Sequence, residues 1–156
     1  MSIVQGQTTQ FKVNLLSGLE NFAAGTPYVY KIALYNANAN LTNSTLAYTS
    51  VNEVTGTGYT AGGQVLTISN TPTGDTSNNI AWVSFNNVTW TGAITARGAL
   101  VYNSTTNASC FILNFGNDVT STNSFTVTFP TAGSTVTKQQ LMLWSIRVWP
   151  NFSRLK

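Results

Sequence analysis

The sequence has no histidine, one cysteine and few charged residues. Without histidine there is no imidazole base, no Ser-His-Asp triad and no histidine ligand for a metal. One cysteine excludes an intramolecular disulfide and a zinc site built from several cysteines. The carboxylates are scattered, so no acid pair is visible; they are Glu20, Glu53, Asp75 and Asp118. These absences favour a protein that binds or builds over one that catalyses.

Long apolar runs are also missing. Runs such as Leu141 to Trp144 reach only four residues, whereas a membrane helix needs roughly 18 to 20. The N-terminal residues show neither a basic stretch nor an apolar core, so we expect no secretory signal and no membrane partner. The lone Cys110 lies in an apolar run, with no Lys or Arg near it in sequence to activate a thiolate. This setting predicts a buried, inert thiol.

Polarity comes instead from uncharged side chains. Charged residues make up 7% of the 156 residues, against about 25% in an average soluble domain. The chain has 25 Thr, 14 Ser and 18 Asn, together more than a third of its length. Hydrophobic residues reach 42%, enough for a substantial core. We predict a single domain over residues 1–156, with 138–156 as a C-terminal contact strand and tail.

Apolar and polar residues alternate in many short stretches, a pattern typical of half-buried β-strands. The predicted strands are Thr9–Leu15, Tyr28–Tyr35, Val65–Ser69, Ile80–Phe85, Ile94–Asn103, Ser109–Phe115, Phe125–Phe129 and Gln140–Trp149. In Ile94–Asn103 we expect the even-numbered residues to share one face. No stretch shows a convincing helical stripe, apart from a single turn considered within Asn43–Asn52.

Turn-forming residues separate these stretches, among them Pro72–Asp75 and Gly116–Asp118. We expect Ser104–Asn107 to close a hairpin between the two strands that flank it. Short strands at roughly 8 to 12-residue spacing indicate a sandwich or barrel. The predicted fold class is all-β, a single-domain antiparallel β-sandwich of jelly-roll-like type.

Two loops match ligand-binding motifs only in part. Gly56–Gly63 is rich in glycine but lacks the Gly-Lys-Ser/Thr ending of a phosphate loop, and we interpret it as a flexible surface loop. Asp75–Asn79 offers oxygen ligands at alternate positions, as calcium loops do, but has only one carboxylate. We therefore expect no cofactor and no metal.

The C-terminal end differs from the rest of the chain. It holds four of the seven basic residues, which are Lys138, Arg147, Arg154 and Lys156. Four charges over nineteen residues are a thin signal for nucleic acid, so the favoured interpretation is that they pair with an acidic neighbouring subunit or stay solvated. In Gln140–Trp149 the even-numbered residues, Met142, Trp144, Ile146 and Val148, form one wholly apolar face. The odd-numbered face is mixed.

These features nominate a set of contact residues. Trp90 and Trp149 are expected to be exposed anchors, because tryptophan is enriched at interfaces, whereas Trp82 and Trp144 are expected in the core. Lys and Glu lose about 1.5 to 2 kcal/mol of side-chain entropy when ordered, so a surface of Thr, Ser and Asn suits burial by other protein. The candidate interface residues are Leu141, Leu143, Arg147, Trp149, Phe152, Arg154 and Trp90.

Five stretches carry a resemblance to a known group of proteins; they are Tyr30–Tyr35, Tyr48–Gly63, Ile94–Asn103, Phe115–Asp118 and Phe125–Pro130. In these stretches the chain resembles small virion structural proteins of tailed double-stranded DNA bacteriophages. The resemblance implies a β-sandwich bound to the capsid shell or to another part of the virion. It does not extend past Thr131. Within the matching stretches, Arg97 and Glu53 are expected to be paired structural residues.

Together these features predict a non-enzymatic capsid decoration (cement) protein that bridges major capsid subunits. Its expected partners are the major capsid protein and further copies of itself, as a trimer, on the capsid surface of a virion made in the bacterial cytoplasm. The alternative is a tail or head-fibre component that binds a host glycan or surface protein through Trp90, Tyr59 or other loop aromatics. A hydrolase built on Asp75 or Asp118 is the third hypothesis.

Overall fold

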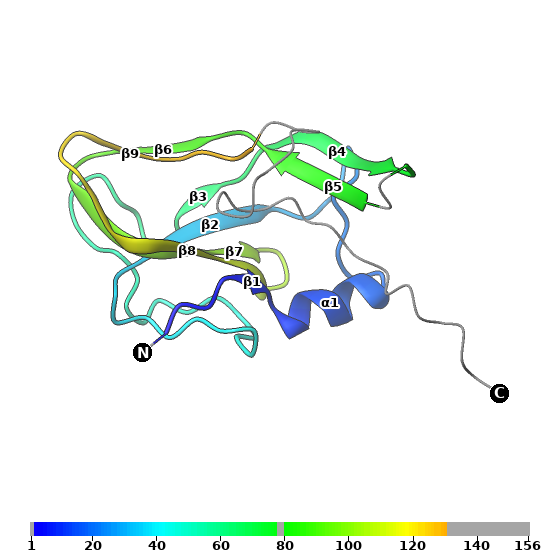
Figure 1. Cartoon of the computed structure of the whole chain (residues 1–156), viewed down its shortest axis with the longest axis horizontal. Coiled ribbons are helices and arrows are strands. Elements are labelled where there is room, and N and C mark those ends of the chain that lie inside the picture. The colour runs from blue at the N-terminus through cyan, green and yellow to red at the C-terminus, as the bar shows by residue number, and fades with distance from the viewer. Residues whose placement is uncertain (1, 78–79, 131–156) are drawn as a thin grey trace.

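A five-stranded antiparallel sheet, in the order β1-β8-β7-β2-β3, forms the centre of the protein (Figure 1). The computed structural model describes residues 2–77 and 80–130. The strands of this sheet are β1 (Gly6–Gln7), β2 (Tyr30–Tyr35), β3 (Gln64–Val65), β7 (Ile94–Asn103) and β8 (Ala108–Ser121). Two further antiparallel ribbons pair β4 (Ile68–Asp75) with β5 (Ile80–Phe85) and β6 (Val88–Thr91) with β9 (Ser124–Val127). With one short helix, α1 (Thr9–Leu16), the described part of the chain is mostly β, as expected.

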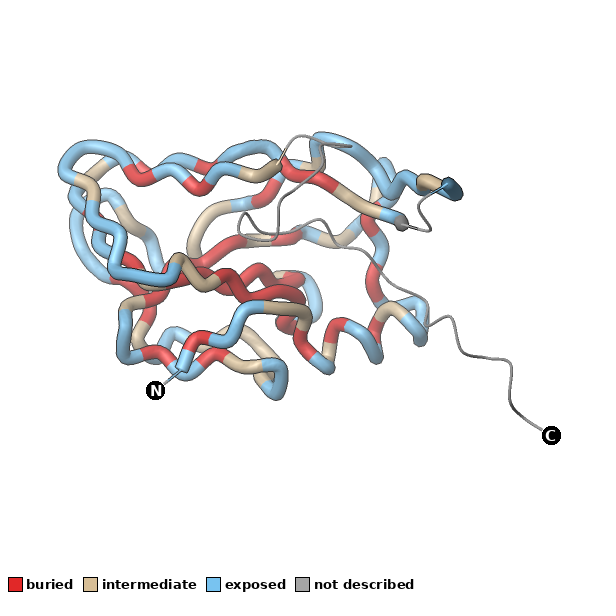
Figure 2. The backbone as a smooth tube through the Cα atoms, in the orientation of Figure 1, coloured by how far each residue is buried: buried red, intermediate tan, exposed pale blue. Residues whose placement is uncertain are grey.

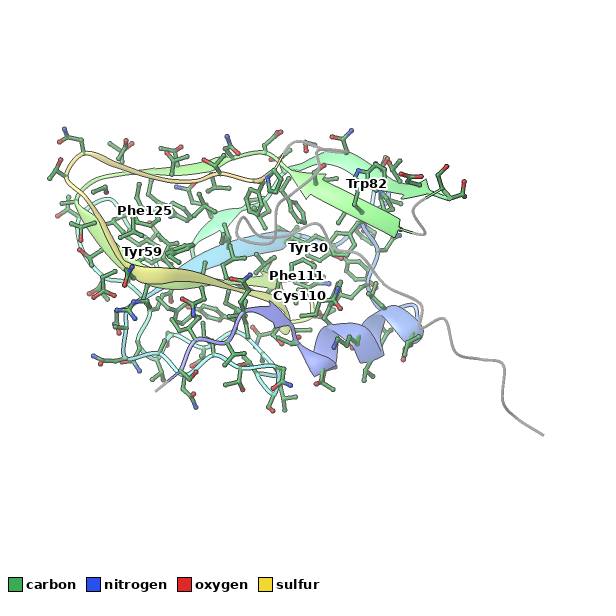
Figure 3. All side chains as sticks on the ribbon, in the orientation of Figure 1. Tyr30, Tyr59, Trp82, Cys110, Phe111 and Phe125 are labelled. Carbon is green, nitrogen blue, oxygen red and sulfur yellow. The ribbon has the colours of Figure 1, made fainter. Side chains whose placement is uncertain are left out.

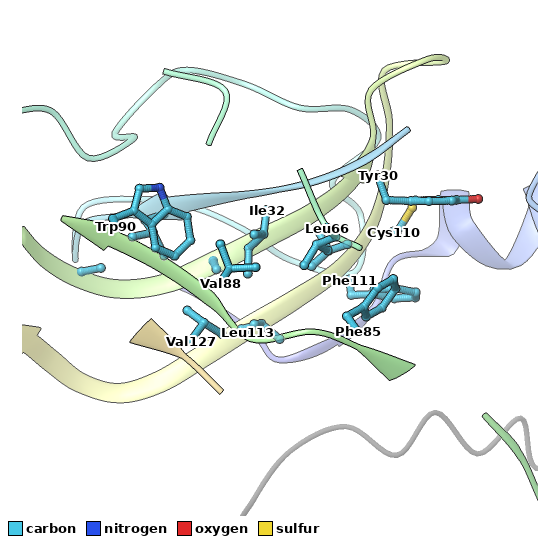
Figure 4. Packing of buried hydrophobic residues seen from close by; sticks show 14 of the residues in the cluster. Tyr30, Ile32, Leu66, Phe85, Val88, Trp90, Cys110, Phe111, Leu113 and Val127 are labelled. Atoms are coloured by element: carbon cyan, nitrogen blue, oxygen red, sulfur yellow. The ribbon is translucent and has the colours of Figure 1, made fainter. Parts of the chain in front are cut away.

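Both faces of the central sheet are covered, so its middle strands are buried on both sides (Figure 2). One face packs against the ribbons: Ile32 and Leu113 of the sheet belong to one core with Val88, Trp90 and Val127 (Figure 4). The other face is covered by the N-terminal segment and the loop after β2. There Ala33, Leu100 and Ile112 form a second core with Ile3 and Leu41.

Several strand predictions are confirmed. Strands β2, β5 and β7 lie within or coincide with the predicted stretches, and β9 overlaps the predicted stretch Phe125–Phe129. Ser104–Asn107 forms the expected hairpin turn, since Asn103 pairs with Ala108. Asn107 supplies the left-handed conformation at a φ of 61°, which asparagine tolerates better than most residues. Strand β6 was not predicted, and the predicted strand Gln140–Trp149 lies outside the described residues.

The stretch Thr9–Leu15 is a helix, so the prediction of a strand there is wrong. Thr8 caps the helix: its Oγ1 accepts the Phe11 N–H at 3.1 Å and donates to the Ser109 carbonyl at 3.0 Å. Phe11 and Leu15, four residues apart, both pack on the core, whereas Val13 is 50% exposed. Phe11, Val13 and Leu15 alternate with polar residues as in a strand. Only Phe11 and Leu15 reach the core, and their spacing of four residues is that of one face of a helix.

Two predicted turns lie inside strands. Gly116–Asp118 is part of β8, and Pro72–Asp75 is part of β4. Between Ala96 and Gly98 the register jumps, because these residues pair with Val119 and Asn114. The extra residues form a bulge rather than a chain reversal.

The same irregularity changes which residues of β7 share a face. Ile94 and Ala96 belong to the core under the ribbons, as do Ala99 and Val101. Leu100 and Tyr102 belong to the opposite core. The expected common face of the even-numbered residues is therefore wrong, because a bulge shifts the alternation by one. Asn43–Asn52 likewise contains turns and a bridge but no helical turn.

No helix in residues 2–77 and 80–130 is long and apolar enough to cross a membrane.

Candidate functional site

Glu53 is the centre of a buried polar cluster. Its carboxylate is 6% exposed and receives hydrogen bonds from the Tyr48 and Tyr59 hydroxyls, each at 2.6 Å. The Gly62 N–H donates a third, at 2.8 Å. Burial, and then the hydrogen bond to Glu53, raise the pKa of both tyrosines well above the usual range.

Strands far apart in sequence hold this cluster in place. The Tyr59 hydroxyl also accepts the Leu34 N–H of β2 at 2.8 Å. From β7, the Tyr102 hydroxyl donates to the Gly62 carbonyl at 2.8 Å. The Tyr35 hydroxyl of β2 donates to the carbonyl of Thr49. The cluster therefore fastens the segment that covers one face of the sheet to the sheet itself.

A second buried carboxylate, Glu20, follows helix α1 and is 7% exposed. It accepts hydrogen bonds from the Tyr30 hydroxyl at 2.8 Å, from Asn103 Nδ2 at 2.9 Å and from Asn14 Nδ2 at 3.2 Å. Burial, and then Glu20, raise the pKa of Tyr30. Figure 3 shows Tyr30 and Tyr59 at opposite ends of the central sheet, so the two clusters are separate.

Both carboxylates are bonded to neutral donors. Among the described residues no Lys or Arg forms a salt bridge with either of them. Three hydrogen bonds to a buried carboxylate satisfy its main acceptor positions. Glu53 is paired, as expected, and its partners are two tyrosine hydroxyls and a backbone N–H. The Glu20 cluster was missed, because residues 14, 20, 30 and 103 meet only in the folded chain.

The other charged candidates lie on the surface. Arg97 Nε donates to Asp118 Oδ1 at 2.8 Å, and these side chains are 34% and 49% exposed. Arg97 is thus paired, as expected. Asp75 accepts the Ser77 N–H at 2.9 Å in a local turn. The part of the chain that the structure describes contains no group of three or more potential metal ligands.

The glycine-rich loop is packed against two strands. A Cβ on Gly63 would lie 1.8 Å from the Ile32 carbonyl oxygen, and a Cβ on Gly58 would lie 1.8 Å from that of Thr91. Both glycines have positive φ angles, 68° and 87°. The interpretation as a flexible surface loop did not foresee that Gly58 and Gly63 lie directly against the backbone of these two strands.

Trp90 is 1% exposed, so the prediction that it is an exposed anchor is wrong. Val88 and Trp90 alternate toward the core in β6, and Trp90 lies edge-on to Phe125 at 6.3 Å. Cys110 is buried as predicted, and burial raises the pKa of its thiol. The remaining interface candidates lie outside the described residues; they are Leu141, Leu143, Arg147, Trp149, Phe152 and Arg154.

The described surface carries little charge. Of seven charged residues in residues 2–77 and 80–130, Glu20 and Glu53 are buried, and Arg97 and Asp118 pair with each other. Apolar side chains are exposed on α1 and just after it: Val13 at 50%, Leu16 at 91% and Leu19 at 52%. No family model, curated protein or solved structure matches the chain.

Proposed function

We propose that the chain is a non-enzymatic structural protein of a bacteriophage virion, a decoration protein that stabilises the head by bridging major capsid subunits. The observation that carries the proposal is the nearly charge-free surface. Outside the ion pair and the buried carboxylates, only Lys12, Lys31 and Asp75 are charged among the described residues. A surface of this kind is poorly suited to a free monomer and well suited to burial by neighbouring subunits.

The sequence resemblance supports the same proposal. The segments that resemble virion proteins include β2, β7 and the Glu53 cluster, which together form the centre of the fold. We propose a β-sandwich, with the central sheet as one layer and the two ribbons as the other. The contact with the shell is proposed for the C-terminal segment, through Leu141, Leu143, Arg147, Trp149, Phe152 and Arg154.

The test is an add-back experiment on phage particles that lack this protein. We expect such particles to lose infectivity faster on heating and on osmotic shock, and added purified protein to restore resistance. Protein carrying Leu143→Asp is expected to fold but not to restore it. Equal resistance of particles with and without the protein would contradict cementing, and a cryo-EM difference map would show whether the protein lies on the capsid.

The alternative of a host-binding tail or head-fibre component depended on exposed aromatic rings. Trp90 is buried, and the Tyr59 hydroxyl is bonded to Glu53 and to the Leu34 N–H. Trp90 therefore offers no ring face to a glycan, and the Tyr59 hydroxyl is already occupied by hydrogen bonds within the protein. No observation on the described residues favours this alternative. This alternative would be supported if the purified protein bound host cells and competed with phage adsorption.

A further inference from the structure

One edge of strand β5 has no partner strand in residues 2–77 and 80–130, and we call it the open edge. Among the described residues β5 pairs only with β4, in a two-stranded ribbon. Most of β4 is exposed, from Ser69 to Gly74. A two-stranded ribbon is marginally stable by itself, and an unpaired edge presents free N–H and C=O groups to a further strand.

Some apolar side chains at the main core are only partly covered. Leu15 of α1, Tyr28, Val83 of β5 and Phe129 pack against the main core but are half-buried. The indole nitrogen of Trp82, also in β5, is buried and has no hydrogen-bond partner among the described residues. In the view of Figure 1, β5 lies between β4 and α1. Of these half-buried side chains, Val83 lies in β5 itself and Phe129 lies against Phe85 at its end, so both are beside the unpaired edge.

The described chain ends close to this edge. The Phe129 N–H donates to Asn87 Oδ1 at 2.9 Å, and the Phe129 ring lies 5.6 Å from that of Phe85, the last residue of β5. Residues 131–156 follow. The ten steps from residue 130 to residue 140 can span up to roughly 33 Å, whereas six-residue β5 is about 20 Å long. The segment Gln140–Trp149 can therefore reach any point along β5.

We propose that Gln140–Trp149 of the same chain adds to the open edge of β5 as a third strand. Its wholly apolar face, Met142, Trp144, Ile146 and Val148, then covers the half-buried side chains between β5 and α1. Its mixed face, which includes Leu143 and Arg147, then points outward. Attachment to the same chain gives this segment a high effective concentration at the edge.

Charge is compatible with this docking. The described residues hold three basic and four acidic side chains, whereas residues 131–156 hold four basic and no acidic ones. The described residues and residues 131–156 therefore carry formal net charges of opposite sign, one negative against four positive.

The test compares hydrogen exchange in three full-length proteins: the wild type, Ile146→Asp and, as matched control, Leu143→Asp. We expect every second amide of β5, those facing away from β4, to be protected in the wild type. Ile146→Asp should speed their exchange by at least about tenfold and lower Tm by roughly 5–10 °C. Leu143→Asp should change neither, and amides of β7 should stay protected in all three proteins.

Two other occupants give distinct results. Protection of β5 that rises with protein concentration, together with a dimer on gel filtration, would show that a second copy supplies the strand and would overturn the proposal. Protection that appears only on capsids would assign the edge to the shell and also overturn it. The docking does not depend on the virion function: failure of the add-back experiment leaves the β5 result unchanged, and the reverse also holds.

Discussion

At the residue scale, the burial of Glu20 and Glu53 without a salt bridge in the described residues needs a physical explanation. A buried carboxylate is costly unless hydrogen bonds replace its hydration. Tyrosine hydroxyls and amide groups supply these bonds at 2.6–3.2 Å, and such charge-assisted bonds are stronger than neutral ones. In a chain with only seven basic residues, tyrosine and asparagine take the place that arginine or lysine fills elsewhere.

Replacing Glu53 by Gln removes the charge and turns one acceptor atom into a donor that faces a tyrosine hydroxyl. The Tyr59 oxygen already accepts the Leu34 N–H, so this hydroxyl is not free to turn and accept a hydrogen bond from the new donor. We expect a loss of about 1.5–3 kcal/mol in the free energy of unfolding, measured by urea denaturation. As control, Asp118→Asn breaks the exposed pair with Arg97 and should cost under about 1 kcal/mol. Equal costs would contradict a structural role for the Glu53 cluster.

Alanine variants at Gly63 and Gly25 distinguish the cost of backbone strain from the cost of a steric clash. Both have positive φ, 68° and 75°, but a Cβ on Gly25 meets nothing within 4 Å, whereas one on Gly63 meets the Ile32 carbonyl at 1.8 Å. Gly25→Ala should cost only the left-handed strain of about 1–2 kcal/mol. Gly63→Ala should cost at least about 3 kcal/mol, because the loop must leave β2. The urea midpoints of the two variants measure this difference. Similar midpoints would mean that the loop moves away from β2 with no loss of stability.

At the element scale, helix α1 depends on one buried threonine. Thr8 is fully buried, caps the helix and also bonds to the Ser109 carbonyl of β8. Thr8 therefore both caps the N-terminus of α1 and attaches the helix to the central sheet. This tertiary anchor explains why an eight-residue helix forms where the sequence alternates like a strand.

We therefore expect Thr8→Ala to lower the free energy of unfolding by about 1–2 kcal/mol. The neighbouring Thr9→Ala is the control: Thr9 is exposed, and alanine has the higher helix propensity, so its effect should be within about 0.5 kcal/mol. Thermal unfolding followed by circular dichroism measures both. Equal losses for the two variants would show that the cap is dispensable.

Strand prediction from alternation succeeded where a strand is regular and has one buried face. In β9, Phe125 and Val127 are buried and Thr126 is exposed, as the pattern indicates. Strands β7 and β8 were also predicted, but the shared face in β7 and the turn at Gly116–Asp118 were wrong, because a bulge shifts the faces and Gly116 continues the strand. A bulge depends on the partner strand, which one sequence stretch does not reveal.

At the scale of the whole molecule, five tyrosines with raised pKa values make the fold sensitive to alkali. Burial is the main cause for all of them; they are Tyr30, Tyr35, Tyr48, Tyr59 and Tyr102. In the unfolded chain a tyrosine ionises near pH 10. Above that pH the unfolded chain binds fewer protons than the folded one, so stability is full below about pH 10 and falls as pH rises.

We expect the urea midpoint to be level from about pH 7 to 9 and to fall steeply above about pH 10. Phenolate absorbance should rise together with unfolding. The Tyr59→Phe variant should be less stable at neutral pH but show a shallower alkaline decline, since one shifted group is gone. A midpoint that stays level to about pH 11 would contradict burial of these hydroxyls.

The sequence by itself determined the β-rich class, the regular strands, the buried thiol and the scarcity of charge, because these follow from composition and from local alternation. Only the tertiary structure decided the helix at Thr9–Leu16, the bulges, the burial of Trp90 and the two carboxylate clusters. Glu53 meets Tyr59 within one loop, but Leu34 and Tyr102 join them from separate strands. Such contacts depend on how strands pair and pack, and this is fixed by the whole chain rather than by any single segment.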